Sequence, residues 1–600
     1  RHCRRMLDPR LYRVAFVPVL LALLVAAFSL QDRPRPIGTT LNPEAFDGIR
    51  AQVTLDDLAR RFPDRRPGSA ADTRLAGEIA AQLRKTVPGT VEEHRFTGDT
   101  IDGRRDLVDV VATRPGIPGP GIVVVAHRDA AGHGAKAELS ATAALLELAR
   151  VAADGRLRRT ITFISTSGGS GGFAGASEEA RRLAARADAI LVIGDVAGAH
   201  TRRPMVVATS NDVGQAPLQL QRTMQAAVRA ELGTDAGAPR ALTQWLRLAV
   251  PVTISEQGPF LRAGQPAVLL SASGERPPAA DAPLNVRRMV PFGRAALRVL
   301  YALDNFRDLA APPKDVLVLR GKVLPSWSVR LLVGALLLPP LLMGIDALAR
   351  LRRRHEPLGA WGVWALSGAV PFLLACLFAV VLAGVGLIAV APGAPVPPDA
   401  LKVGAGPVVA FVAILLVFAL GWLVARPALL HATGAARPTR RSPSADQPGG
   451  VVALGLTTVV VAGALWLGNP YAAMLVVPAA HLWPWALTPD LRLPRSASLA
   501  IVVLALFPLG LVGLLDARAF GMGPVHGAWF WTILVAGGHV PVGSWVLWSF
   551  VWGCAIGAGL LAIRRRRPRD DDPDEVTVRG PVTYAGPGSL GGTPSGLRQR

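Results

Sequence analysis

The sequence predicts a chain in two parts: an α/β domain with a mainly parallel sheet and helices on both faces, and an all-α polytopic membrane domain. The chain has 600 residues, which is about four times the usual length of one domain. Half of these residues are hydrophobic. Apolar runs long enough to cross a membrane occur near the start and throughout the second half, whereas the sequence between residues 31 and 325 is polar and periodic.

The first apolar run covers residues 11–30 and follows a basic start, RHCRR. A run of about 20 residues can cross the hydrocarbon core of a bilayer. The sequence SLQDRPRP that follows lacks a small-x-small cleavage site, so we expect an uncleaved anchor rather than a signal peptide. Later apolar segments lie near residues 327–349, 361–390, 404–425, 450–468, 471–487, 499–515 and 543–563.

Basic clusters set the expected orientation of these spans. They include the N-terminus, Arg350 with Arg352 to Arg354, Arg437 with Arg440 and Arg441, Arg492 with Arg495, and Arg564 to Arg567. The positive-inside rule then predicts a multi-pass plasma-membrane protein with both termini in the cytoplasm. The expected division is a basic cytoplasmic N-terminus (1–10), an anchor (11–30), an extracytoplasmic domain (31–325), a membrane domain of about seven further helices (326–563) and a disordered cytoplasmic tail (564–600).

One apolar segment leaves the number of spans open. Residues 529–542 are apolar but short, and they contain two glycines and a proline. An interfacial helix, a re-entrant segment and a further span are all compatible with this pattern.

Composition argues against several classes of function. The three cysteines, Cys3, Cys376 and Cys554, cannot form a disulfide framework or a thiolate zinc site. The net charge is +22, but the arginines are scattered without interleaved aromatic residues, so we expect no nucleic-acid partner and take the lipid bilayer as the partner of the apolar half. The later spans lack buried carboxylates, which makes a transporter the weakest alternative.

The polar region alternates buried-strand patterns with amphipathic helical patterns. We expect strands at 107–113, 121–127, 160–166, 189–196 and 267–273, with helices that include 70–87 and 138–155. This alternation is typical of a parallel sheet covered by helices. Ligands of such sheets bind at the carboxyl ends of the strands, so the residues that follow each strand are the candidates for a site.

Those residues resemble the di-zinc aminopeptidases of metallopeptidase family 28. The segments that carry the resemblance are AHRDA (126–130), GAKAELSA (134–141), STSGGSGGFAGA (165–176), IGDVAG (193–198) and SEQGPFLRAGQPAV (255–268). RPGSAADTRLAGEIAAQL (66–83) also resembles the family's first helix. The resemblance covers about residues 50–310 and implies a zinc-aminopeptidase-like fold for the extracytoplasmic domain.

The same resemblance implies a degenerate metal site. It gives His127 and Asp195 the role of metal ligands and Asp129 the role of orienting His127. The bridging Asp of the family falls on Ala137, the general-base Glu on Gly169, the next metal-binding Glu on Ser170 and the last His on Gln257. Two of five ligands therefore remain and no base does, so we predict an inactive homologue without a cofactor. Its expected partner is a peptide or envelope protein, bound outside the membrane in a cleft that persists at the strand ends.

An active zinc-dependent aminopeptidase is the alternative. A single ion held by His127 and Asp195 would need a third ligand, for which Glu138 and His133 are the nearest candidates in the sequence. Without an ion, these two residues would be hydrogen-bonded to each other or to backbone.

The glycine-rich loop at residues 168–172 suggests two weaker alternatives. It matches a Gly-x-Ser-x-Gly nucleophile elbow, with Ser170, Asp195 and His200 as a triad, but His200 is only five residues beyond Asp195. A phosphate-binding loop is also conceivable, but the Gly-Lys-Ser/Thr ending of nucleotide sites is missing.

Overall fold

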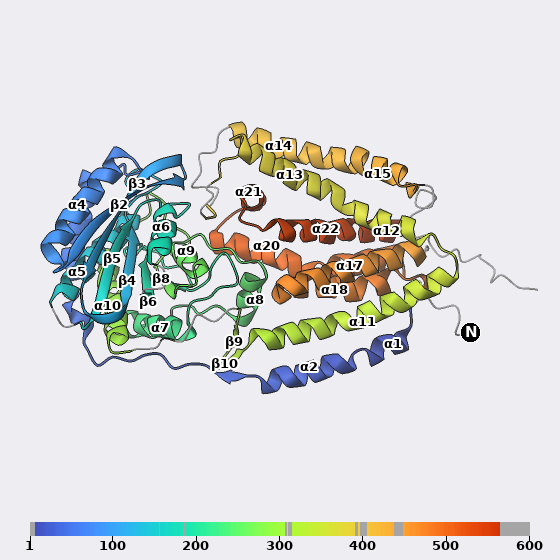
Figure 1. The fold of residues 1–600 in the computed structure, drawn as a ribbon, viewed down its shortest axis with the longest axis horizontal. Coiled ribbons are helices and arrows are strands. Elements are labelled where there is room, and N and C mark those ends of the chain that lie inside the picture. The colour runs from blue at the N-terminus through green and yellow to red at the C-terminus, as the bar shows by residue number, and fades with distance from the viewer. Residues whose placement is uncertain are drawn as a thin grey trace, which may run out of the picture.

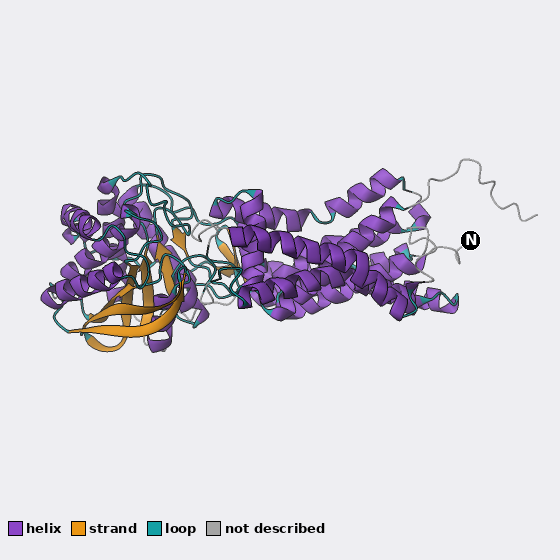
Figure 2. Cartoon of the chain, turned by 90° about the horizontal axis from the view of Figure 1, so that it is seen from above, coloured by secondary structure: helices purple, strands orange, loops and turns teal. Residues whose placement is uncertain are grey.

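The computed structural model describes residues 7–154, 157–183, 187–306, 309, 315–390, 394–396, 405–436, 448–491 and 493–564. The molecule is elongated, with an α/β domain at one end and a bundle of long helices that runs away from it (Figure 1; Figure 2). The N-terminal RHCRR cluster, Arg437, Arg440, Arg441, Arg492, Arg565 to Arg567 and the predicted disordered tail beyond them lie outside the described residues.

The α/β domain contains one seven-stranded sheet with the strand order β2-β3-β5-β4-β6-β8-β7. The strands are β2 (Thr90–Thr100), β3 (Gly103–Arg114), β4 (Ile117–His127), β5 (Arg159–Thr166), β6 (Ala187–Ile193), β7 (Val206–Val207) and β8 (Ala267–Leu270). The four central strands β5, β4, β6 and β8 are parallel, and the remaining neighbours pair antiparallel. This confirms the predicted fold class. Sequence reasoning did not single out β2 and β7, because β2 is half exposed and β7 has only two residues.

Helices cover both faces of this sheet. They are α3 (Gly48–Arg61), α4 (Ala70–Thr86), α5 (Lys136–Ala153), α6 (Ala174–Leu183), α7 (Leu218–Leu232), α9 (Gln257–Arg262) and α10 (Met289–Asp304). Helix α8 (Ala241–Ala249) lies apart from the sheet and packs against the helical region. Short 3₁₀ turns lie at Pro43–Ala45 and Val286–Arg288.

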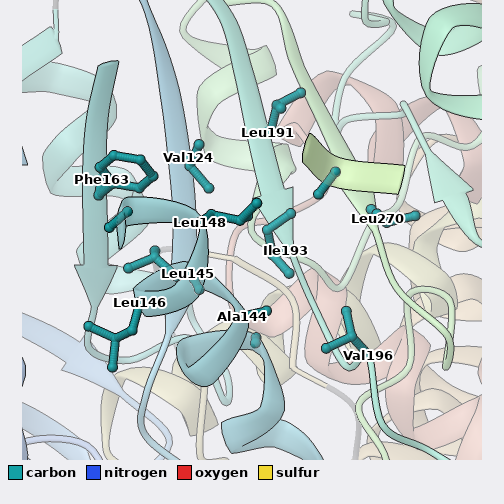
Figure 3. Close-up of a cluster of buried hydrophobic side chains, with 14 of the residues drawn as sticks. Val124, Ala144, Leu145, Leu146, Leu148, Phe163, Leu191, Ile193, Val196 and Leu270 are labelled. Carbon is teal, nitrogen blue, oxygen red and sulfur yellow. The ribbon is translucent and has the colours of Figure 1, made fainter. Parts of the chain in front are cut away.

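Alternation along the strands assigns each side chain to one face. In β4, Ile122 and Val124 join the hydrophobic cluster that includes α4, α5, α7 and α10, while Val123 and Val125 join the cluster that includes α6 and α9. Figure 3 shows Leu145 and Leu148 of α5 beside Val124 and its neighbours in the sheet. Because both faces are buried, the strand reads as a continuous apolar run.

The second part of the chain is helical. Its helices are α1 (Pro9–Val14), α2 (Val17–Phe28), α11 (Ser326–Arg353), α12 (Leu358–Leu366), α13 (Val370–Gly384), α14 (Ala405–Leu420), α15 (Arg426–Ala432), α17 (Pro448–Gly468), α18 (Pro470–Leu487), α19 (Arg495–Leu504), α20 (Phe507–Phe520), α21 (Pro524–Ala536) and α22 (Val542–Ile563).

Six helical segments of the described residues are long and apolar enough to cross a membrane, or seven if the bent pair α19–α20 forms one span. The six are Pro9–Phe28, Ser326–Arg353, Leu358–Gly384, Ala405–Ala432, Pro448–Gly468 and Val542–Ile563. The prediction of about eight spans also counted the segment now seen as α18, which has two internal prolines and packs against α17 and α11. The doubtful segment at 529–542 contains the end of the short helix α21 and a turn that leads into α22.

The two parts are joined by more than the chain itself. A small sheet of β1 (Gln31–Asp32), β10 (Lys322–Leu324) and β9 (Leu317–Leu319) brings together the two ends of the α/β domain. Beside it, the Trp245 indole donates to the Tyr471 carbonyl at 3.3 Å, and the Asn469 amide donates to the Leu248 carbonyl at 2.7 Å. Helix α8 is therefore fixed to the start of α18.

Asn469 is the residue through which this junction is most easily tested. Its side-chain oxygen caps α18 by accepting from the amides of Tyr471 (3.0 Å) and Ala472 (3.2 Å), while its amide group binds α8. We expect Asn469→Ala to lower the stability of the full chain by about 1–2 kcal/mol, because both a cap and a link between the parts are lost.

Thermal unfolding in detergent checks this prediction. Asn42→Ala is the matched control, since Asn42 is exposed and its side chain caps no helix. Equal unfolding midpoints for the two variants would show that the junction does not contribute to stability.

Candidate functional site

The candidate residues meet at the carboxyl ends of the parallel strands. His127 is the last residue of β4, Asp195 follows β6, and Ser170 lies in the loop after β5. Together with Glu138 in the first turn of α5 and Glu256 just before α9, these residues line one cavity of about 40 Å³.

His127 is held by a carboxylate other than the one the resemblance implied. Its Nδ1 lies 3.2 Å from Oε2 of Glu256, and the other Glu256 oxygen accepts a hydrogen bond of 2.6 Å from the Thr166 hydroxyl. The exposed fraction is 12% for the His127 side chain and 3% for Glu256. The expectation that Asp129 orients His127 is therefore replaced by a buried His127–Glu256 pair. Sequence reasoning missed Glu256, although it directly precedes Gln257 in the SEQGPF segment.

Asp129 instead binds the loop that follows β5. Its carboxylate accepts from the backbone amides of Gly169 and Ser170, both at 2.9 Å, and from the Ser170 hydroxyl at 2.5 Å. The residue that takes the place of a metal-binding Glu is thus a hydrogen-bond donor to Asp129. This arrangement also leaves Ser170 without the histidine that a nucleophile elbow requires, since His200 is exposed and lies outside the cavity.

Asp195 is satisfied by its own turn and by neighbouring hydroxyl groups. Oδ1 accepts from the amides of Ala197 (2.9 Å) and Gly198 (2.8 Å) and, at 3.4 Å, from the Ser140 hydroxyl, while Oδ2 accepts from the Ser273 hydroxyl. Asp195 and His127 are hydrogen-bonded to different groups. Both carboxylates that the resemblance assigns to the metal site are therefore bound by the protein itself.

Gly169 leaves no room for a side chain. A Cβ atom at Gly169 would meet the Cβ and Cγ atoms of His127 and would lie 3.0 Å from Oε1 of Glu256. The His127–Glu256 pair thus occupies the volume into which a general-base Glu would project. Ala137 is buried and supplies no polar side-chain atom.

Gln257 lies outside the cavity and belongs to a separate hydrogen-bond network. It is fully buried, and its amide donates to the Thr209 carbonyl at 3.0 Å and to the Thr253 hydroxyl at 2.9 Å. It does not line the cavity at the strand ends. Gln257, on which the resemblance places a histidine ligand, therefore fixes the segment before α9.

Buried charge dominates the electrostatics of the site. Burial lowers the pKa of His127, but the hydrogen bond to Glu256 and the negative charges of Glu256, Asp129 and Glu138 outweigh it and raise this pKa to about 9. Burial raises the pKa of Glu138 to about 7, against the opposing charges of His127 and Arg65. At neutral pH His127 is therefore an imidazolium among carboxylates.

These residues do not fit a zinc ion. Among the described residues, no group of three or more His, Cys, Asp or Glu side chains is placed to hold a metal. A catalytic zinc usually has three protein ligands, and here the carboxylates point their oxygens at backbone amides and hydroxyls. His133, considered as a third ligand, is exposed and outside the cavity. Glu138 does line it, and its Oε2 and the Nε2 of His127 are buried without a protein hydrogen-bond partner.

The cavity at the strand ends is small. A cavity of about 40 Å³ has room for a few water molecules but not for a peptide. The connection between α13 and α14 packs close to the loop that lines this cavity, and its residues Ala394 and Val396 are buried. A Cβ at Gly171 would lie 2.5 Å from Cγ2 of Ile101 and 3.0 Å from Cγ1 of Val396. At the strand ends, the expected cleft is therefore reduced to this small cavity.

Comparisons with known proteins give similarity of architecture only. No protein-family model matches the sequence, and no curated protein sequence matches it. A glutaminyl cyclase from an Acidobacteriales bacterium is 15% identical with a TM-score of 0.36, over 45% of this chain and 99% of that one. The LapA aminopeptidase of Legionella pneumophila is 14% identical with a TM-score of 0.35, over 44% and 74% of the two chains. The zinc aminopeptidase BSAP from Bacillus subtilis is 13% identical with a TM-score of 0.35, over 44% and 99%. These identities and TM-scores are too low to assign the activity of those proteins to this chain. The fold class stated above rests on the observed strand order.

The raised pKa of His127 predicts how stability depends on pH. Because the pKa rises from 6.5 in the unfolded chain to about 9, the stabilisation is complete below pH 6.5 and is lost as the pH rises through 9. The shift in the pKa of His127 stabilises the folded state by about 3 kcal/mol at low pH. The raised pKa of Glu138 adds a second loss of stability at lower pH, as the pH rises from 4.5 to about 7.

We expect the thermal unfolding midpoint of the full chain in detergent to decrease as the pH is raised from 6.5 to 9. In the His127→Gln variant, this decrease should be absent. His133→Gln, at an exposed histidine, should retain it. A decline that persists unchanged in His127→Gln would mean that another group titrates.

The close contact at Gly169 gives a second prediction. Gly169→Ala should destabilise the chain by about 1–3 kcal/mol, because the new methyl group overlaps the His127 side chain. Gly77→Ala is the control: Gly77 is exposed in the middle of α4 with open space around it, and alanine there should stabilise by about 0.5–1 kcal/mol. Denaturant titration of both variants would measure these changes, and a neutral Gly169→Ala would show that the site is looser than described.

Proposed function

We propose that this chain is a membrane-anchored, peptidase-like protein that has no zinc-dependent hydrolytic activity and binds a partner outside the membrane. The observation that carries the proposal is the His127–Glu256 pair, which fills the space beside Gly169. Zinc-dependent hydrolysis needs a metal-bound water and a base that takes its proton. The space beside Gly169 is occupied, Asp129 and Asp195 are hydrogen-bonded to the protein, and the described residues hold no group of three metal ligands.

The orientation proposed from the basic clusters is supported by where the described clusters lie. Arg350, Arg352 and Arg353 end α11, and Arg564 follows α22, both at the end of the bundle far from the α/β domain (Figure 1). The N-terminal helix reaches the same end, where Arg350 pairs with Asp8 at 3.2 Å. The positive-inside rule assigns this end to the cytoplasm, so the α/β domain lies outside.

The small cavity at the strand ends narrows the class of partner. A peptide does not fit into about 40 Å³ unless the surrounding side chains move. An envelope protein or a lipid that contacts the outer surface of the α/β domain requires no such opening. We therefore place the proposed partner at the surface of the domain or at its junction with the membrane rather than at the former metal site.

The alternative, an active zinc aminopeptidase, is tested by metal content. The full chain in detergent is incubated with zinc, dialysed and measured by elemental mass spectrometry beside His127→Ala, and both are assayed with amino-acid amide substrates. We expect near-zero zinc and no hydrolysis in both samples. About one ion per chain that is lost in His127→Ala would overturn the proposal and restore the aminopeptidase interpretation.

A further inference from the structure

A second and much larger cavity lies where the α/β domain meets the helical region. Its volume is about 900 Å³, and residues of β7, α7, α8, β9 and α20 line it. Figure 1 shows α8 and β9 beside the bundle at this junction. Cavities of several hundred Å³ are typical of small-molecule and cofactor sites.

The polar lining of this cavity is strongly cationic. Arg33, Arg203, Arg240, Arg247, Arg320 and Arg518 line it, and the single acidic lining residue is Glu275. Glu275 is already engaged by Arg247, at 2.8 Å. The other five arginines form no ion pair with any residue that the structure describes; Arg33 and Arg203 have only neutral partners, Gln225 at 3.3 Å and Thr234 at 2.8 Å.

Arg33 is the least compensated of these charges. Its Nε is buried without a hydrogen-bond partner among the described residues. Burial and the neighbouring charge of Arg222 lower the pKa of the Arg33 guanidinium, against a weaker opposite effect of Asp235. Arg33 is partly buried and faces no carboxylate at ion-pair distance among the described residues, and an anion at this position would compensate its charge.

The remaining lining is apolar and continues onto a membrane helix. Val206, Val207 and Leu218 come from the α/β domain, Val318 and Leu319 from β9, and Leu515 from α20. Helix α20 belongs to the bent pair that is long and apolar enough to be one span, and its Leu514 is 47% exposed. The cavity therefore has a cationic wall on the side of the domain and an apolar wall that leads toward the hydrocarbon region.

We propose that this cavity binds an anionic phospholipid from the leaflet that faces the α/β domain. The phosphate would lie among the arginines, and part of an acyl chain would lie along Leu515 and the apolar residues of β9. Arginine suits phosphate because its planar group donates two parallel hydrogen bonds. The volume exceeds what a free phosphate ion fills, and the apolar wall favours an amphiphile over a soluble anion.

Native mass spectrometry of the full chain in detergent tests this proposal. The chain is titrated with phosphatidylglycerol and with phosphatidylcholine of the same acyl chains, and inorganic phosphate is added as a competitor. We expect phosphatidylglycerol to bind at least about tenfold more tightly than phosphatidylcholine, because each arginine near the headgroup contributes to the attraction. Millimolar phosphate should displace little of it.

The matching variant is Arg240→Glu combined with Arg518→Glu, which reverses two exposed charges of the cavity wall. It should weaken phosphatidylglycerol binding at least about tenfold. Arg74→Glu combined with Arg262→Glu makes the same change of charge at exposed positions outside the cavity and should leave binding unchanged. Arg240→Gln with Arg518→Gln, a milder change, should give a smaller loss in the same direction.

Three results would overturn the proposal. Equal binding of the two lipids would show that no anionic headgroup is recognised. An equal loss of phosphatidylglycerol binding in Arg240→Glu with Arg518→Glu and in the control Arg74→Glu with Arg262→Glu would show that overall charge, rather than this cavity, attracts the lipid. Binding of inorganic phosphate as tight as that of phosphatidylglycerol would assign the arginines to a soluble anion.

Discussion

The site at the strand ends depends on one constraint: carboxylates buried where parallel strands end must each find a positive charge or hydrogen-bond donors. Asp129 finds the amides of Gly169 and Ser170, and Asp195 finds the amides of its own turn. Glu256 is left for His127, whose imidazolium form it stabilises. The positive charge among these carboxylates is thus supplied by a side chain, and the lack of a Cβ at Gly169 lets that side chain pack against the loop after β5.

Sequence reasoning predicted the architecture well because the apolar runs that form the central strands are buried on both faces, and such runs are visible in the sequence. It also brought His127, Ser170 and Asp195 to one end of the sheet, since each follows a strand. It could not predict the His127–Glu256 pair, because the two residues are 129 positions apart and only the folded chain decides which carboxylate the imidazole reaches. The packing of Val396 beside Gly171 could not be predicted for the same reason, because Val396 belongs to the distant connection between α13 and α14.

The junction between the two parts links the site to the membrane. Val252 and Ile254, which lie just before Glu256, pack in one cluster with Phe520 and Phe530 of α20 and α21. Arg247 lies 4.7 Å above the ring of Phe520 and pairs with Glu275, which lines both the small cavity and the large one. Contacts made by the membrane helices therefore set the position of the segment that carries Glu256. The α/β domain thus carries a small cavity at its strand ends and a large, arginine-lined cavity at its junction with the helices.

The most direct test of this account is an experimental structure of the full chain determined in the presence of zinc, with an anomalous difference map recorded at the zinc absorption edge. The account predicts no anomalous peak at the strand ends and a hydrogen bond between Nδ1 of His127 and the carboxylate of Glu256, as found here at 3.2 Å. A peak bound by His127 and Asp195, with Glu256 turned away, would contradict it and show that the imidazolium does not replace the metal.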